Sequence, residues 1–210
     1  MIERKRMPRL IVIRHGVTEW SKTGQHTGRT DLPLLDEGVH EAIEFGDRLV
    51  GYSDQAVLCL PEIGYILRSP RTRCVQTLEC MLGTEEQRKM MGMPNVQVLD
   101  DCREWDYGQY EGQTTECIRK TRPGWNVFEH GTPSHETNPD LPGESPEQIS
   151  ERADRVVKLI REWHQTTKKD VVIFTHGHFS NVLIGRFLRL PLSMSCLLYT
   201  SPSPRDRQTS

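Results

Sequence analysis

The 210-residue sequence has no long apolar run and almost no net charge. No stretch approaches the roughly 20 apolar residues that a membrane-spanning helix needs. Lysine and arginine number 27 and aspartate and glutamate 29, so the chain lacks the basic surface that binds nucleic acid or anionic lipid. The composition therefore predicts a protein that binds neither nucleic acid nor membranes.

The sequence also lacks paired cysteines and metal-binding spacings. Its six cysteines are scattered, none forms Cys-x-x-Cys, and no histidine or cysteine spacing is that of a zinc site. The basic N-terminus has no small-residue cleavage site typical of a secretory signal. Unpaired cysteines without a secretion signal indicate a reducing compartment. We therefore expect a cytoplasmic protein with no metal and no cofactor.

The sequence does contain short apolar runs that alternate with helical patterns. Its length fits one domain with a substantial core. Strands are predicted at 10–13, 63–67, 96–99 and 171–174. Helices are predicted at 36–50, 70–82, 85–91, 114–120, 145–166 and 182–188, and 122–143 is a long loop. This alternation predicts an α/β three-layer sandwich, with a mainly parallel sheet and helices on both faces.

Three helix details follow from local signals. Asp36 is predicted to cap the helix at 36–50, whose buried stripe would include Val39 and Ile43. Ser69 before a proline is expected to cap the next helix. Ser145 opens a capping box for the longest helix.

The C-terminal end differs in composition from the rest. We expect one domain at 8–195 and a disordered tail at 196–210, which is rich in serine and proline. The tail resembles a translated transposon-type sequencing adapter, so our hypothesis is that the natural protein is cut off near Ser195. An ordinary disordered tail is the alternative.

Reactive side chains follow each of the predicted strands. Arg14 and His15 come after the first strand, Arg73 after the second, Glu104 after the third and His176 after the fourth. The carboxyl ends of parallel strands meet at one edge, where ligands bind. Arginines with an imidazole suit a tetrahedral dianion, a second imidazole can attack phosphorus, and a carboxylic acid can protonate a leaving alkoxide.

These residues lie in four motifs that resemble the histidine phosphatase (phosphoglycerate mutase-like) superfamily, branch 1. The motifs are Arg14-His15-Gly16, Ser69-x-x-x-Arg73-x-x-x-Thr77, Glu104-x-x-x-Gly108-x-x-x-Gly112 and His176-Gly177. The resemblance implies a phosphoglycerate mutase-like fold and a metal-independent phosphatase. It implies that His15 becomes phosphohistidine, that Glu104 is the proton donor, and that the phosphoryl group is clamped by Arg14, Arg73 and His176.

Within this family, three stretches resemble fungal-type sedoheptulose bisphosphatases: Thr18 to Leu34, Arg103 to Gly112 and His176 to His178. The chain departs from that group at Asn181, where the group carries arginine. The resemblance implies a small phosphorylated sugar as substrate, with sedoheptulose 1,7-bisphosphate as the favoured one. Substrate contacts are expected from Ser21, Thr27, Gly28, Arg71, Tyr107 and His178.

Two other functions stay open at this point. Phosphoglycerate mutases of the family carry an Arg-Arg pair after the acid motif, whereas this chain has the separated Arg119 and Arg122. A non-catalytic module that binds a phosphorylated ligand is the third interpretation. The sequence is compatible with a homo-oligomer.

Overall fold

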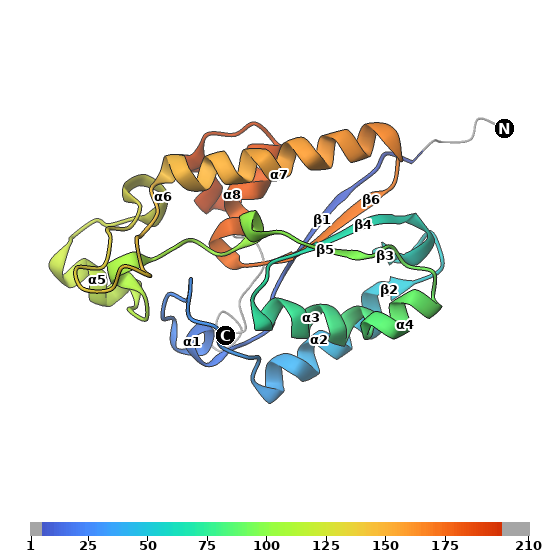
Figure 1. The fold of residues 1–210 in the computed structure, drawn as a ribbon, viewed down its shortest axis with the longest axis horizontal. Coiled ribbons are helices and arrows are strands. Elements are labelled where there is room, and N and C mark those ends of the chain that lie inside the picture. The colour runs from blue at the N-terminus through green and yellow to red at the C-terminus, as the bar shows by residue number, and fades with distance from the viewer. Residues whose placement is uncertain (1–5, 199–210) are drawn as a thin grey trace, which may run out of the picture.

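The computed structural model describes residues 6–198, and its centre is a parallel β-sheet (Figure 1). The sheet has four strands in the order β1-β6-β4-β5, all of them parallel. They are β1 (Leu10–Arg14), β4 (Ile63–Arg68), β5 (Val96–Val98) and β6 (Asp170–Thr175). The sequence predicted all four. It did not predict the small second sheet, which pairs β2 (Val50–Gly51) with β3 (Leu58–Cys59).

Helices cover both faces of the main sheet, as Figure 1 shows. Two helices on each face make most of the cover: α7 (Pro146–Thr166) and α8 (Gly177–Phe187) on one face, α2 (Asp36–Leu49) and α3 (Thr72–Leu82) on the other. The short helices are α1 (Glu19–Thr23), α4 (Glu85–Met90), α5 (Thr115–Thr121) and α6 (Val127–His130). The 3-10 segments are η1 (Leu60–Glu62), η2 (Asp100–Cys102), η3 (Gly108–Tyr110) and η4 (Leu192–Leu198). The predicted α/β sandwich is confirmed.

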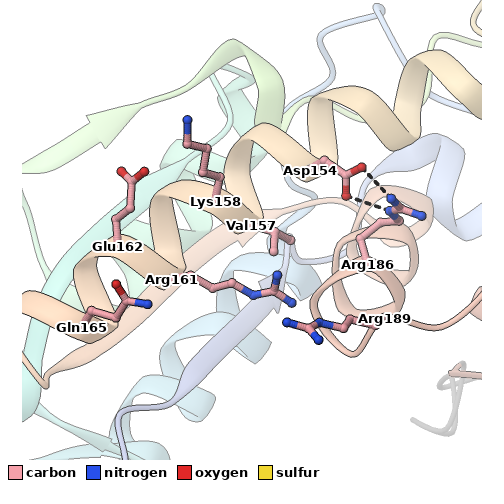
Figure 2. A pocket seen from close by; sticks show the side chains of 8 residues that line it. All are labelled: Asp154, Val157, Lys158, Arg161, Glu162, Gln165, Arg186 and Arg189. Atoms are coloured by element: carbon pink, nitrogen blue, oxygen red, sulfur yellow. Dashed lines mark hydrogen bonds and ion pairs between the residues drawn. The ribbon is translucent and has the colours of Figure 1, made fainter.

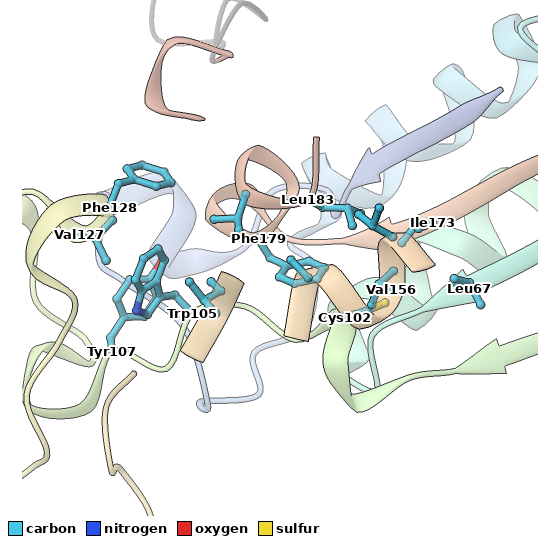
Figure 3. Packing of buried hydrophobic residues seen from close by; sticks show 14 of the residues in the cluster. Leu67, Cys102, Trp105, Tyr107, Val127, Phe128, Val156, Ile173, Phe179 and Leu183 are labelled. Atoms are coloured by element: carbon cyan, nitrogen blue, oxygen red, sulfur yellow. The ribbon is translucent and has the colours of Figure 1, made fainter. Parts of the chain in front are cut away.

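The central strand β6 feeds two separate hydrophobic clusters. Successive side chains of a strand point to opposite faces, so Val171 and Ile173 join the cluster under α7 and α8. Val172 and Phe174 join the cluster under α2 and α3. Figure 3 shows the first cluster, which extends from the sheet into the irregular segment that carries Trp105. Loop residues therefore share a core with the sheet.

The helix α2 buries a different face from the predicted one. Ile43 is 43% exposed, whereas the buried residues are Gly38, Ala42 and Gly46. A Cβ added at Gly46 would lie 2.9 Å from the Cα of Met81 on α3. The two helices approach so closely that only the smallest residues fit between them, and the larger apolar side chains are displaced toward solvent. Asp36 is also not the N-cap, because the helix begins at it.

The start of α3 also differs from the prediction. Its N-cap is Arg71, which makes no capping side-chain bond. The missing acceptor comes from a distant loop, where the carboxylate of Asp31 accepts from the backbone N–H (2.9 Å) and the hydroxyl (2.8 Å) of Thr72. Ser69 is instead free to contact His176, with its Oγ 2.8 Å from the ring Nε2. By contrast, the predicted capping box of α7 is confirmed.

The last described element, η4, runs from Leu192 to Leu198 and contacts α8 and α6, so it overlaps the first three residues of the predicted tail. Residues 199–210, which carry the rest of that tail, lie outside the described residues. The 8–195 boundary and the adapter origin stay predictions.

Candidate active site

Three strand ends meet at one edge of the main sheet. His15 follows β1, Ser69 follows β4 and His176 follows β6. The strands are in register there, because the backbone N–H of His15 donates to the Thr175 carbonyl and that of Ser69 to the Phe174 carbonyl, both at 3.0 Å. The backbone alone therefore brings the two imidazoles together, as the sequence predicted, and it adds the Ser69 hydroxyl, which the sequence did not predict there.

His15 presents an unprotonated ring nitrogen. Its Nδ1 lies 2.8 Å from the carbonyl oxygen of Gly16, which can only accept, so Nδ1 carries the proton and Nε2 carries the lone pair. Burial, followed by the charges of Arg14 and Arg73, lowers the pKa of His15 well below its usual value of 6.5. The ring therefore stays neutral at physiological pH, which is the state a nucleophile needs.

His176 is held from both sides of its ring. Arg73 Nε donates to its Nδ1 at 3.2 Å, so the proton is on Nε2, which faces the Ser69 hydroxyl. The ring centroid lies 5.3 Å from that of His15, with the planes at 64°. Burial and the neighbouring Arg73 lower the pKa of His176 well below 6.5. The two rings thus form a close, neutral pair.

Arg73 is completely buried beside this pair. Its Nη1 donates to the carbonyl of Thr30 at 3.0 Å, and its Nη2 donates to the carbonyls of Thr27 (3.1 Å) and Gly28 (3.4 Å). Burial lowers the pKa of Arg73, yet the group stays charged, because a guanidinium titrates far above neutral pH. These bonds fix the plane of a positive charge next to His15 and His176.

Arg14 and Arg71 add further positive charge. A Cβ added at Gly177 would lie 3.4 Å from Arg14 Nε, which places that guanidinium at the start of α8. Its charge contributes to lowering the pKa values of both His15 and His178. Arg71 Nε is buried without a hydrogen-bond partner in the described part of the chain. A donor in that state is suited to an anionic ligand.

Glu104 is anchored at the start of α8. Its Oε1 accepts from the amides of Trp105 (2.9 Å) and Phe179 (2.8 Å), and its Oε2 accepts from that of His178 (3.0 Å). A helix N-terminus favours a carboxylate through these unpaired N–H groups. Because Oε2 accepts only one of the three bonds, it keeps a lone pair that can carry a proton.

A wall of neutral aromatic groups adjoins Glu104. The hydroxyl of Tyr107 is hydrogen-bonded to His178 Nδ1, and His26 stacks on the Tyr107 ring with centroids 4.5 Å apart. Burial lowers the pKa of His26 to about 3 and that of His178 to about 4, and it raises the pKa of Tyr107 well above 10. The sequence interpretation missed His26, because nothing in its local context indicates a partner 81 positions away.

Three predicted contacts are engaged within the protein. The Ser21 hydroxyl donates to the Thr18 carbonyl (2.9 Å) and accepts from the Thr18 amide (2.7 Å), which caps α1. Thr27 Oγ1 donates to the Gln25 carbonyl at 3.3 Å. The Gly28 amide donates to Glu111, so that N–H is not directed at a substrate. Substrate contacts from these groups would require the existing bonds to break.

Two hollows lie outside this cluster of histidines and arginines. One, of about 440 Å³, lies between α7 and α8, and Figure 2 shows its side chains; they are Asp154, Val157, Lys158, Arg161, Glu162, Gln165, Arg186 and Arg189. The other, of about 300 Å³, includes Glu104 and Arg152 in its lining. Across residues 6–198, no group of three or more histidine, cysteine, aspartate or glutamate side chains could hold a metal ion. No helix within that range is long and apolar enough to cross a membrane.

The chain resembles known phosphatases over most of its length. It is 38% identical over 188 residues to an acid phosphatase of Mycobacterium tuberculosis, and the aligned region covers 88% of this chain and 78% of that protein. It is 35% identical over 205 residues to the sedoheptulose 1,7-bisphosphatase of Saccharomyces cerevisiae, and the aligned region covers 90% of this chain and 70% of that protein.

Solved structures share the fold. A structure from an open reading frame of Mycobacterium tuberculosis has a TM-score of 0.72 and 35% identity, and the match covers 91% of this chain and 86% of that one. An Escherichia coli structure described as a putative α-ribazole-5′-P phosphatase has a TM-score of 0.69 at 20% identity, with 91% and 85% coverage. The family model of the histidine phosphatase superfamily (branch 1) matches residues 10–197. The chain therefore belongs to that superfamily.

Proposed function

We propose that the chain is a phosphatase that releases phosphate from a small sugar bisphosphate, by way of a phosphohistidine on His15. The observation that carries this proposal is the neutral His15 ring, whose Nε2 lone pair lies in the field of Arg14 and Arg73. A neutral imidazole between fixed cations suits attack on an anionic phosphorus centre. Sedoheptulose 1,7-bisphosphate is the favoured substrate, supported by the 35% identical yeast relative and the shared motif stretches.

The first step transfers the phosphoryl group to the enzyme. The Nε2 lone pair of His15 forms a bond to phosphorus as the bond from phosphorus to the sugar oxygen breaks. Arg14 and Arg73 stabilise the charge on the phosphoryl oxygens, and Arg71 contributes its unpartnered Nε. His176 donates its Nε2–H to these oxygens in place of the Ser69 hydroxyl. Glu104 gives a proton from Oε2 to the departing sugar oxygen. The sugar monophosphate then leaves.

The second step restores the enzyme. Glu104, now a carboxylate, takes a proton from water as the water oxygen forms a bond to phosphorus. The bond between phosphorus and His15 Nε2 breaks, its electron pair returns to the ring, and orthophosphate leaves. Because Nδ1 keeps its proton throughout and donates it to the Gly16 carbonyl, the ring returns in the same tautomer.

The alternative is transfer of phosphate between positions, as in a mutase. The positions of Arg119 and Arg122, the two arginines after the acid motif, argue against a mutase. Arg119 donates to the carbonyl of Trp125 at 3.0 Å, and Arg122 donates to the hydroxyl of Tyr110 at 3.3 Å. Both guanidiniums thus have partners within their own loop region and do not form a pair available for a substrate carboxylate.

The test is phosphate release from sedoheptulose and fructose bisphosphates, with and without EDTA. We expect the parent protein to release phosphate equally in both conditions, to prefer the sedoheptulose compound, and to become labelled by ³²P-substrate at a histidine. His15→Ala should lose both release and label. His135→Ala, which changes a histidine of the long loop, is the matched control and should behave as the parent.

Each contrary outcome points to a different function. Net transfer of phosphate between positions of phosphoglycerate, with no release, would indicate a mutase. Binding of phosphorylated sugars that His15→Ala leaves unchanged, with no labelled protein, would indicate a non-catalytic module. Either result from a folded parent would overturn the phosphatase proposal.

A further inference from the structure

Glu111 is a partly buried carboxylate near the site that the proposed reaction does not use. It follows η3, and two amides from a loop far away in sequence donate to it. The Gly28 N–H lies 3.0 Å and 3.1 Å from its two oxygens, and the Thr30 N–H lies 2.9 Å from Oε1. Burial raises the pKa of Glu111, while these amides act in the opposite direction.

The same loop, residues 27–30, also holds Arg73. The loop's N–H groups at Gly28 and Thr30 donate to Glu111. Its carbonyls at Thr27, Gly28 and Thr30 accept from the Arg73 guanidinium. Gly28 and Thr30 are thus each bonded twice, through the N–H to the Glu111 carboxylate and through the carbonyl to the Arg73 guanidinium. If Glu111 were absent, two amides would lose their acceptor and the carbonyls would no longer be held in place.

The position of Arg73 is in turn coupled to the histidines. Its Nε reaches His176 Nδ1 at 3.2 Å, and its charge lowers the pKa values of both His15 and His176. A shift of the loop would therefore move the guanidinium relative to the site of the phosphoryl group. Displacements of about 1 Å in such groups can cost on the order of a hundredfold in rate.

We propose that Glu111 is a positioning residue for phosphate recognition: by fixing residues 27–30, it holds the Arg73 guanidinium against His176. This inference rests on the proposed role of Arg73 in binding the phosphoryl group. The competing interpretation is that Glu111 only stabilises the fold.

Two substitutions of Glu111 separate these interpretations. Glu111→Gln keeps an oxygen that can occupy the Oε1 position and accept from both amides, whereas Glu111→Ala removes both bonds. The matched control is Asp154→Ala. Asp154 also accepts two hydrogen bonds, at 2.7 Å and 2.6 Å from Arg186, but it lies in the hollow between α7 and α8 (Figure 2).

The experiment measures binding of inorganic phosphate by calorimetry and follows the Arg73 Nε–H by NMR, including its hydrogen exchange. We expect Glu111→Ala to weaken phosphate binding by about tenfold or more and to shift the Arg73 signal with faster exchange. Glu111→Gln should recover most of the affinity and signal, and Asp154→Ala should match the parent in both.

The proposal is overturned if Glu111→Ala lowers stability but leaves the phosphate affinity and the Arg73 signal at parent values. If the alanine variant does not fold, Glu111→Asp, which withdraws the carboxylate by one methylene, is judged by the same criteria. Neither readout requires turnover, and the Arg73 signal requires no ligand. Failure of every sugar to release phosphate would therefore count against the proposed function without deciding the role of Glu111.

Discussion

The site is built from two regions that arise in different ways. The first is the sheet edge, where β1, β4 and β6 end in register and deliver His15, Ser69 and His176. The second is the loop wall, which we define as residues 25–31 packed against residues 104–112. It contains no strand of the main sheet and is held by side-chain carboxylates and aromatic rings.

The two regions position their functional groups in different ways. At the sheet edge, the hydrogen bonds of a parallel sheet position reactive groups before any side chain contributes. In the loop wall, irregular backbone segments need individual partners, such as Glu111 for the N–H groups of Gly28 and Thr30. Arg73 links the regions, since its side chain bonds His176 on one side and the loop carbonyls on the other. Variants should therefore show whether the regions act separately or together.

The largest effect is expected at this link. Arg73→Lys keeps the charge but loses the planar fork that bonds the loop carbonyls and His176 together. We expect kcat/KM to fall on the order of 10²- to 10³-fold, as for loss of a fixed charge-stabilising donor. Steady-state kinetics on the best sugar bisphosphate measure it.

Arg88→Lys is the matched control for this change. Arg88 is also a buried arginine that donates to a backbone carbonyl, that of Gly83, but it belongs to α4. Its substitution should leave kcat/KM near the parent value. Equal losses in the two variants would mean that Arg73 matters for stability alone and that the regions are not linked.

The contrast also explains what could be predicted from the sequence. His15 and His176 were found because an aliphatic run that stops at a reactive residue is a local signal. Glu111 and His26 have partners at Gly28 and Thr115, 83 and 89 positions away, and no local pattern encodes such pairs. The same limit applies to α2, whose buried face is set by how closely α3 approaches.

A smaller effect is expected from crowding the loop wall. A Cβ at Gly28 would lie 2.4 Å from the Trp105 carbonyl oxygen, so Gly28→Ala must push the two halves of the wall apart. We expect a loss of about 1–3 kcal/mol in the free energy of unfolding. We also expect weaker phosphate binding, because the loop carbonyls that hold Arg73 move with Gly28. Urea unfolding and calorimetry measure the two effects.

The control for crowding is Gly51→Ala, where the nearest atom to the new Cβ is the side chain of Ala56 at 3.2 Å. That variant should keep its phosphate affinity. If Gly28→Ala loses stability but binds phosphate as the parent does, the sheet edge positions Arg73 without help from the wall.

The pH dependence of the free energy of unfolding should report the burial of His26 in the loop wall. Its folded pKa is about 3, so between pH 6.5 and that value the unfolded chain binds a proton that the folded chain does not. The free energy of unfolding therefore falls as the pH is lowered, with a slope that approaches about 1.4 kcal/mol per pH unit for each such group well below pH 6.5. His15, His176 and His178 act in the same direction, whereas the raised pKa of Glu111 opposes them.

His26→Phe keeps a ring on Tyr107 but removes one of these titrations. We expect the stability loss between pH 6.5 and 5.5 to be about 1 kcal/mol smaller than in the parent, measured by urea unfolding at both pH values. His40→Phe, on the exposed side of α2, controls for the replacement of a histidine by phenylalanine outside the loop wall. An unchanged slope in His26→Phe would show that this imidazole is protonated in the folded wall.

The smallest effect is expected from Tyr107→Phe, which removes only the hydroxyl that bonds His178. One lost hydrogen bond in a buried site costs about 0.5–1.5 kcal/mol, which corresponds to roughly 2- to 13-fold in a rate or binding constant. Because the His178 amide also holds Glu104 Oε2, we expect part of this loss in kcat as well as in KM. Tyr65→Phe, on the stacked Tyr65–Trp163 pair away from the site, is the control and should leave both constants unchanged. If Tyr107→Phe lowers stability and alters neither constant, the aromatic part of the wall only packs, and the chemistry belongs to the sheet edge and to Arg73.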